Sequence, residues 1–307
     1  MRRAFVSELI RLAERDPSVV LLTGDLGYSV LEPFADLFPD RFFNMGVAEQ
    51  NMLGVATGLA ASGFTPFAYS IATFASMRGY EFFRNGPILH ELPVRLVGVG
   101  GGVDYGHNGP THYALEDIGL MRVQPSLTVI APADVPQAAT AMREIAAIPG
   151  PVYLRLGKEA GELAGLDGRF ELGRAVTIGH GTDVAIVTYG SVATEALAAS
   201  ELLESAGIHA RVVVTACLAP PPVDDLLSAL GAVPLTVTVE AHFQNGGLGS
   251  LVSEVVAEHA LGCRVLRRAI TTMPRGSSGD PAYLYERYGL SARRVADAVL
   301  AAVAIGN

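Results

Sequence analysis

The segment QNMLGVATGLAASGFTPFAYSIATFASM, residues 50–77, decides the fold of this chain because it carries no charged side chain. An uncharged run of this length is long enough to cross a bilayer, which takes about 20 residues. The run is interrupted by Ser62-Gly63 and by Pro66, and its threonines and serines are scattered along it. These interruptions favour a buried helix, a turn and a buried strand. We therefore expect no membrane span here.

Strand-like and helical patterns alternate on both sides of this segment. Short apolar runs lie at 19–23, 94–99, 127–131 and 152–156, and helical patterns lie at 47–61 and 136–147. This alternation is typical of a parallel sheet with helices on both faces. It restarts at 184–188 and ends in a helix at 291–303, after a polar, glycine-rich stretch at 158–170 that is typical of a linker.

The length of 307 residues agrees with two domains rather than one. We predict an α/β fold in which a parallel-sheet domain, residues 1–165, is followed by a second and smaller α/β domain, residues 166–307. The boundary follows from the change in composition at the linker.

The composition excludes several classes of protein. The chain has 31 acidic and 22 basic side chains and a net charge of −9, so we expect no nucleic-acid partner. Lys158 is the only lysine, which leaves no lysine-containing phosphate loop. Cys217 and Cys263 are isolated, so neither a disulfide framework nor a zinc site is indicated. The early charge of Glu8 argues against a signal peptide, and we expect a cytoplasmic protein.

Four segments fall at strand ends or helix starts, where open α/β sheets bind ligands. They are 24–29, 44–51, 98–117 and 240–249. The second of them contains Glu49, which opens a helix with almost no other charge. This carboxylate either interacts with the helix dipole or is a buried catalytic acid, and its spacing alone leaves both interpretations open.

The third segment places His107, Asn108 and His112 on one glycine-rich loop. They are candidate acid/base groups or substrate hydrogen-bonding groups, and the alternative is a surface loop with solvated histidines. The two histidines lack a third ligand nearby, so we predict no metal site. The fourth segment, 240–249, lacks the known dinucleotide and phosphate-loop patterns, which favours a tight packing turn.

Five motifs in the chain together resemble the transketolase family of thiamine-diphosphate enzymes. They are GDLGYS at 24–29, RFFNMGVAEQNM at 41–52, GPTH at 109–112 with EDI at 116–118, PSLTVIAPAD at 125–134, and EAH at 240–242 with GGLG at 246–249. The resemblance runs from Arg2 to Ala302. It implies the family's parallel-sheet pyrimidine-binding domain, followed by its smaller, mixed-sheet C-terminal domain.

The resemblance implies a role for Glu49 as a catalytic and cofactor-binding residue. In this family the matching glutamate hydrogen-bonds N1′ of the aminopyrimidine and activates thiamine diphosphate, which suits a carboxyl beside an uncharged run. Phe74 matches the aromatic residue that stacks on the pyrimidine, with core packing as the alternative. Ile71 and Arg78 are implied as further cofactor contacts. The sequence Arg78-Gly-Tyr-Glu is more similar to the deoxyxylulose-phosphate synthase and oxo-acid dehydrogenase β branches.

The resemblance also implies contacts to the substrates. His112 matches a catalytic histidine that contacts a hydroxyl or carbonyl of the donor. Ser29 and Arg2 match residues that hold the acceptor's phosphate, and Arg3 is an alternative counterpart of Arg2.

Two positions depart from the pattern of sugar-phosphate transketolases. Asn108 stands where those enzymes carry an acid, and Gly100 stands where they carry a phosphate-contacting histidine. These departures make an unphosphorylated or differently placed acceptor credible. His107 either takes over part of the lost role or faces water.

A larger departure concerns the diphosphate. The family binds the diphosphate and its Mg²⁺ through a separate domain with a Gly-Asp-Gly motif, and this sequence contains no such motif. The resemblance therefore implies the smaller subunit of a split transketolase, whose N-terminal partner subunit binds the diphosphate and Mg²⁺. It further implies an α2β2 heterotetramer in which two copies of this chain touch.

Three functions follow as hypotheses from this resemblance. The first is transfer of a two-carbon ketol unit from a ketose donor to an aldehyde acceptor, with small-molecule substrates. The second is acyl or acyloin transfer with a 2-oxo acid donor, which Arg78 and the two departures favour. The third is a non-catalytic assembly subunit, which the presence of Glu49 disfavours.

Overall fold

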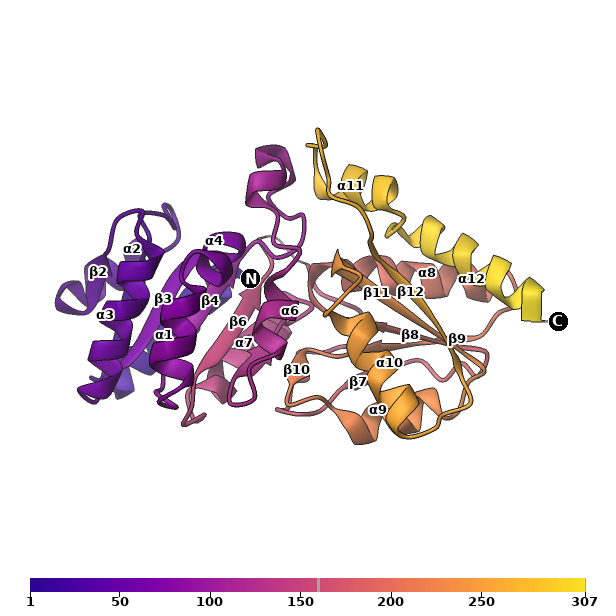
Figure 1. Ribbon diagram of the computed structural model, residues 1–307, viewed down its shortest axis with the longest axis horizontal. Coiled ribbons are helices and arrows are strands. Elements are labelled where there is room, and N and C mark those ends of the chain that lie inside the picture. Colours follow the sequence, from indigo (N-terminus) through magenta and orange to yellow (C-terminus); the bar gives the residue numbers. More distant parts are fainter. Residues whose placement is uncertain (159–160, 307) are drawn as a thin grey trace.

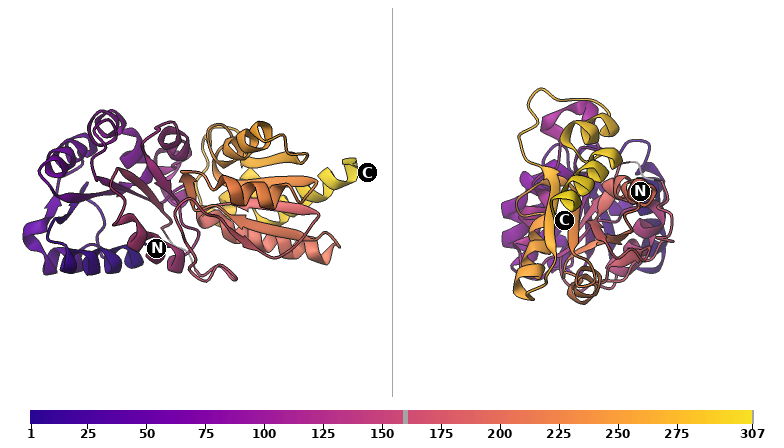
Figure 2. Two further views of the ribbon diagram at one scale, coloured as in Figure 1. Left: turned by 90° about the horizontal axis from the view of Figure 1, so that it is seen from below. Right: turned by 90° about the vertical axis from the view of Figure 1, so that its right-hand side faces the viewer.

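The computed structural model describes residues 1–158 and 161–306, and two α/β units lie side by side along its longest axis (Figures 1 and 2). The first unit contains a seven-stranded sheet with the order β10-β5-β6-β4-β3-β1-β2. The strands are β1 (Val19–Thr23), β2 (Phe42–Asn44), β3 (Thr65–Ile71), β4 (Arg95–Val99), β5 (Thr128–Ile130), β6 (Val152–Leu156) and β10 (Cys217–Ala219). The helices beside them are α1 (Arg2–Arg15), α2 (Glu32–Leu37), α3 (Glu49–Ala61), α4 (Ala72–Met77), α5 (Tyr80–Phe83), α6 (Asp117–Arg122) and α7 (Val135–Ile145).

The second unit contains a five-stranded sheet with the order β12-β11-β8-β9-β7. Its strands are β7 (Val176–Ile178), β8 (Val184–Thr188), β9 (Ala210–Val214), β11 (Leu235–Phe243) and β12 (Arg264–Ile270). Its helices are α8 (Ala193–Ser205), α9 (Val223–Leu230), α10 (Leu248–Glu258), α11 (Pro281–Tyr288) and α12 (Ala292–Gly306). The antiparallel pairing of β7 with β9 makes this sheet mixed.

The predicted α/β class is confirmed, with a mostly parallel sheet followed by a smaller mixed one. Every residue of β1, β4 and β6 is buried, as expected for parallel strands covered by helices on both faces. The helix predicted at 47–61 begins at Glu49. The strand β10 was not expected in the first sheet, because it follows the linker in sequence and pairs antiparallel with β5.

Part of the predicted linker lies outside the described residues, namely 159 and 160. Beyond this gap, Leu163 and Leu166 are buried and pack in the core of the second unit. The part of the predicted linker that follows the gap is therefore packed against the second unit. Among the described helices, none is long and apolar enough to cross a membrane.

A buried ion pair lies where the two units meet. Arg155 Nε and Asp117 Oδ2 are 2.9 Å apart, and both side chains are almost fully buried. Arg155 Nη2 donates to the carbonyl of Ala114 in the first unit (2.8 Å) and to the carbonyl of Ala241 in the second (3.1 Å). Tyr153 donates its hydroxyl to Asp117 (2.8 Å). One guanidinium thus connects the two units.

Candidate active site

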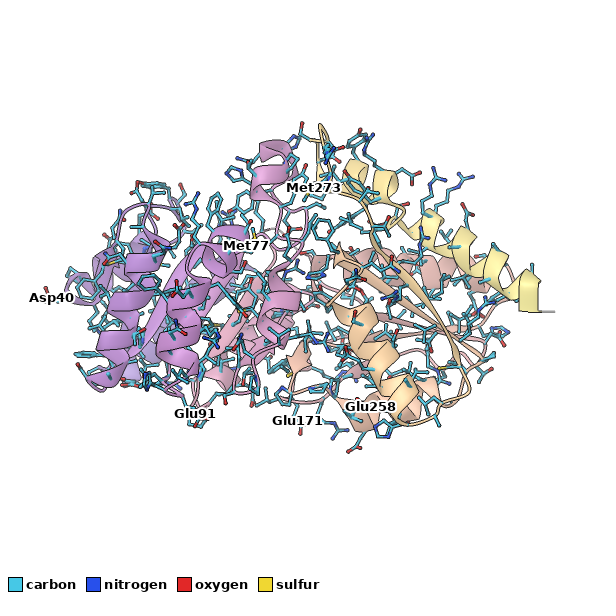
Figure 3. The ribbon with its side chains drawn as sticks, viewed as in Figure 1. Asp40, Met77, Glu91, Glu171, Glu258 and Met273 are labelled. Carbon is cyan, nitrogen blue, oxygen red and sulfur yellow. The ribbon has the colours of Figure 1, made fainter. Side chains whose placement is uncertain are left out.

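The candidate site lies at the carboxyl edge of the first sheet. The neighbouring parallel strands β4, β3, β1 and β2 all end there, so Gly100, Ile71, Gly24 and Met45, which end or follow these strands, share one edge. Figure 3 shows Met77, the neighbour of Arg78, on the upper side of the first unit, and Glu91, which precedes β4, on the lower side. This edge is where open α/β sheets bind ligands.

Glu49 is buried at this edge, with 2% of its surface exposed. It is the first residue of α3, which follows β2. Its Oε1 accepts a hydrogen bond from Ser70 Oγ in β3 (2.9 Å), and a Cβ at Gly24 would lie 3.4 Å from the same oxygen. Because position 24 is a glycine, no side chain projects from its backbone toward the Glu49 carboxylate.

Arg78 joins Glu49 to an aromatic ring. Its Nη1 donates to Glu49 Oε2 at 3.1 Å, and its guanidinium carbon lies 3.9 Å from the centroid of the Phe74 ring. The Arg78 side chain is 45% exposed, whereas the Glu49 side chain is 1% exposed. In this ion pair Glu49 is buried, whereas Arg78 is in contact with solvent.

His112 continues the row of contacts from Phe74. The rings of Phe74 and His112 meet edge to face with centroids 5.2 Å apart, and the centroid of the Tyr105 ring lies 6.3 Å from that of His112. His112 Nδ1 also lies 3.0 Å from Thr111 Oγ1. Ile71 is half-buried at the end of β3, directly before α4. The structure thus brings three separate segments of the chain together, namely Glu49, the pair Phe74 and Arg78, and His112.

Ser29 and Arg2 line one pocket of about 490 Å³. Arg3 and Lys158 also line it, and Arg2 Nε donates to the carbonyl of Lys158 (3.3 Å). Ser29 has a positive φ of 62°, and its N–H donates to Glu32 (2.7 Å). Three cationic side chains therefore surround a cavity that an anionic group fits. This cavity is called the basic pocket below.

His107 and Asn108 are exposed and do not join the row that leads from Glu49 to His112. His107 lines a second pocket of about 510 Å³ at the junction of the two units, together with Lys158, Ser191, Asp280 and other residues. The backbone N–H of Asn108 donates to the carbonyl of Tyr105 (2.8 Å). The loop thus separates its two histidines.

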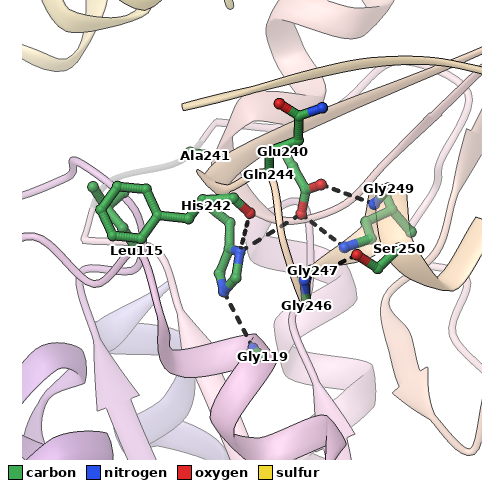
Figure 4. A network of polar contacts seen from close by, with 12 residues as sticks. Leu115, Gly119, Glu240, Ala241, His242, Gln244, Gly246, Gly247, Gly249 and Ser250 are labelled. Atoms are coloured by element: carbon green, nitrogen blue, oxygen red, sulfur yellow. Dashed lines mark hydrogen bonds and ion pairs between the residues drawn. The ribbon is translucent and has the colours of Figure 1, made fainter. Parts of the chain in front are cut away.

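The glycine-rich turn before α10 is a packing turn, as favoured above. Figure 4 shows that Glu240 fills the start of the helix, where its carboxylate accepts hydrogen bonds from the N–H groups of Leu248 (2.7 Å) and Gly249 (2.8 Å). His242 lies beside it, donating from Nδ1 to the Phe243 carbonyl (2.6 Å) and accepting at Nε2 from the Gly119 N–H (3.1 Å). Burial raises the pKa of Glu240 to about 7 and lowers the pKa of His242.

Sequence reasoning missed three residues of this edge. Ser70 holds the carboxylate of Glu49, Tyr105 lies against His112, and Lys158 lines both pockets. Ser70 lies within an apolar strand and gives no local signal. An aromatic residue inside a glycine-rich loop, as at Tyr105, and a lone lysine, as at Lys158, are signals that could have indicated the other two.

Two family models match most of the chain. One describes the transketolase pyrimidine-binding domain and matches residues 1–162, and the other describes the transketolase C-terminal domain and matches residues 173–295. Residues 163–172 lie between the matches. The predicted boundary near residue 165 stays a prediction, since β10 crosses between the units.

The relatives agree with this match. A putative transketolase C-terminal section of Methanocaldococcus jannaschii is 37% identical over 98% of this chain and 95% of its own length. A subunit of the apulose-4-phosphate transketolase of Phocaeicola vulgatus is 33% identical over 94% of this chain and 93% of its own length. A 6-deoxy-6-sulfo-D-fructose transketolase subunit of a Clostridium species is 36% identical over 96% and 92%.

Solved structures show the same architecture. A protein described as a split gene transketolase, inactive beta4 tetramer, superposes with a TM-score of 0.90 at 40% identity, covering 99% of this chain and 98% of its own. A transketolase variant of Pichia stipitis shares the fold at 23% identity with a TM-score of 0.83, and this chain covers 46% of it. The predicted family is confirmed: this chain belongs to the transketolase family.

Proposed function

We propose that this chain is the smaller subunit of a split transketolase, which transfers a two-carbon ketol unit from a ketose donor to an aldehyde acceptor. One observation carries the proposal, namely the buried Glu49 carboxylate at the sheet edge, linked through Arg78 and Phe74 to His112. Relatives of nearly equal length that are named as transketolase subunits support it.

The residues around Glu49 fit the aminopyrimidine half of thiamine diphosphate, the cofactor that the family implies. Arg78 is a long, half-exposed side chain that covers both Glu49 Oε2 and the Phe74 ring, so its displacement would free an acceptor oxygen and an aromatic face together. When bound, the cofactor supplies the nucleophilic carbon of the reaction. Glu49 then holds a proton at the pyrimidine nitrogen, and Ser70 keeps the carboxylate oriented.

The diphosphate half of the site belongs, in this proposal, to a partner subunit. Across residues 1–158 and 161–306, no three His, Cys, Asp or Glu side chains are grouped so that they could hold a metal ion. We propose that the partner binds Mg²⁺ and diphosphate, in an α2β2 assembly with contacts between copies of this chain. The exposed Val55 on α3 and Phe82 on α5 support such contacts, because large apolar side chains gather at interfaces.

In this proposal the substrates bind beside the residues that lead from Phe74 through His112 to the basic pocket. His112 lies next to Phe74 and is placed to hydrogen-bond a donor hydroxyl or carbonyl. Arg2, Ser29 and Lys158 surround a cavity for an anionic end of the acceptor. The exposed His107 and Asn108 are proposed to contact the part of a substrate that reaches the junction of the units.

We further propose a cytoplasmic location, since Cys217 and Cys263 are buried and unpaired. Free thiols of this kind are typical of a reducing compartment.

The test is to mix the purified chain with a candidate diphosphate-binding subunit, thiamine diphosphate and Mg²⁺, and to follow ketol transfer from xylulose 5-phosphate to an aldehyde. Transfer is expected only when both chains are present. Transfer by this chain alone, or by the partner alone, would contradict the division of the site between two chains.

A 2-oxo acid donor is the second candidate, because 1-deoxy-D-xylulose-5-phosphate synthases are also relatives, for example at 34% identity in Syntrophotalea carbinolica over 47% of that protein. Release of CO₂ from pyruvate in the same mixture would favour it over ketol transfer. The placement of Glu49 in a buried, hydrogen-bonded position argues against a purely structural subunit, the third hypothesis.

A further inference from the structure

The Tyr105 ring occupies the space next to Gly100 at the sheet edge. Gly100 follows β4 with a φ of +75°, and a Cβ at this position would overlap the ring of Tyr105. The ring therefore fills the space into which any side chain at position 100 would project. A side chain at position 100 and the observed position of the Tyr105 ring exclude each other.

Tyr105 lies between the two parts of the candidate site. Its ring centroid is 6.3 Å from that of His112, which contacts Phe74 on the side of Glu49. The ammonium group of Lys158 lies 5.1 Å from the same ring, and Lys158 lines the basic pocket. A ligand that extends from His112 to the basic pocket therefore passes the Tyr105 ring.

Backbone contacts hold the loop that carries this ring. Gly102 and Ala114 form an antiparallel bridge across the loop, and the Tyr105 carbonyl accepts from the N–H of Asn108. Burial raises the pKa of Tyr105 above its ordinary value. The Tyr105 side chain is half-buried.

We propose that Tyr105 determines acceptor specificity, in that its ring forms the wall of a channel between His112 and the basic pocket. It contacts the carbon chain of an aldehyde acceptor that is long enough to reach that pocket with an anionic end. A short, uncharged aldehyde stays beside His112 and does not need this wall. The inference rests on the proposed function, since it concerns the acceptor of that reaction.

The experiment compares two acceptors in the two-subunit enzyme, namely glycolaldehyde and D-ribose 5-phosphate. We expect Tyr105→Ala to lower kcat/KM for D-ribose 5-phosphate about tenfold, the loss expected for one aromatic contact, and to change that for glycolaldehyde by less than about twofold. Tyr105→Phe, which keeps the ring, should restore most of the lost selectivity. Tyr283→Ala, an exposed tyrosine on α11, serves as the control.

A binding measurement separates this inference from the proposed function. The dissociation constant of D-ribose 5-phosphate, measured by calorimetry without a donor, should rise about tenfold in Tyr105→Ala and stay unchanged in Tyr283→Ala. Equal effects on both acceptors, or no effect on the phosphorylated one, would overturn the role of Tyr105. If the wild-type enzyme transfers no ketol unit, the proposed function fails, and the binding constants alone still decide on Tyr105.

Discussion

At the scale of single residues, the proposed chemistry depends on Glu49. Its carboxylate is buried and held by Ser70, so Glu49→Gln keeps the shape and the hydrogen bond from Ser70 but removes the acid. We expect ketol transfer by the two-subunit enzyme to fall by at least about a hundredfold, the lower range for loss of a positioned acid/base group. Steady-state rates with an unchanged circular dichroism spectrum provide the measurement. Glu14→Gln, on the exposed face of α1, is the control, and comparable turnover in the two variants would count against the role of Glu49.

Arg78 gives a second prediction at this scale. Replacing it with Met removes the ion pair to Glu49 and the contact with the Phe74 ring. Because Arg78 is half-exposed, we expect the free energy of unfolding to fall by only on the order of 1 kcal/mol. Urea titration of the cofactor-free chain measures this change. Arg84→Met is the matched control, since the exposed Arg84 side chain donates to the neighbouring Asn85. Equal losses in both variants would show that the ion pair between Arg78 and Glu49 adds nothing to stability beyond the loss of an exposed arginine.

At the scale of elements, Glu240 ties β11 to the start of α10. Burial raises its pKa in the folded protein to about 7, above the ordinary value of 4.5. The folded state therefore binds the proton more tightly, so this group's contribution to stability is full below about pH 4.5 and is lost as the pH rises to about 7. We expect Glu240→Gln to flatten this part of the stability profile, measured by urea titration between these pH values. A slope as steep as that of the wild type and of Glu258→Gln, a control at the exposed end of α10, would contradict this assignment.

The sequence predicts some elements well and others poorly, for physical reasons. Runs such as 19–23 and 184–188 are apolar throughout because both faces of a parallel strand are buried, and the structure places strands there. In contrast, β10 has three residues and owes its place to pairing with β5, which no local pattern encodes. In the candidate site, the motifs around Glu49 and His112 could be found in the sequence. The contact of Ser70 with Glu49 could not, because it depends on which strands end side by side.

At the scale of the whole molecule, Arg155 holds the two units together. Arg155→Met would leave the buried carboxylate of Asp117 without its cation and would remove the guanidinium's hydrogen bonds to the carbonyls of Ala114 and Ala241. We expect a loss of about 3–5 kcal/mol in the free energy of unfolding, measured by urea titration. Arg174→Met, which breaks an exposed pair with Asp225, should cost no more than about 1 kcal/mol. A similar small loss for Arg155→Met would show that the junction does not depend on this ion pair.

The position of β10 in the first sheet affects whether the first unit can exist without the rest of the chain. The strand covers the outer edge of β5 with residues that follow β9 in the chain. A fragment that stops before β10 would expose a row of unpaired backbone groups, and such an edge is a template for pairing with other chains. We therefore expect that a first unit isolated by proteolysis or by truncation before β10 is prone to aggregate. The second half of the chain thus supplies the strand that covers an edge of the first sheet.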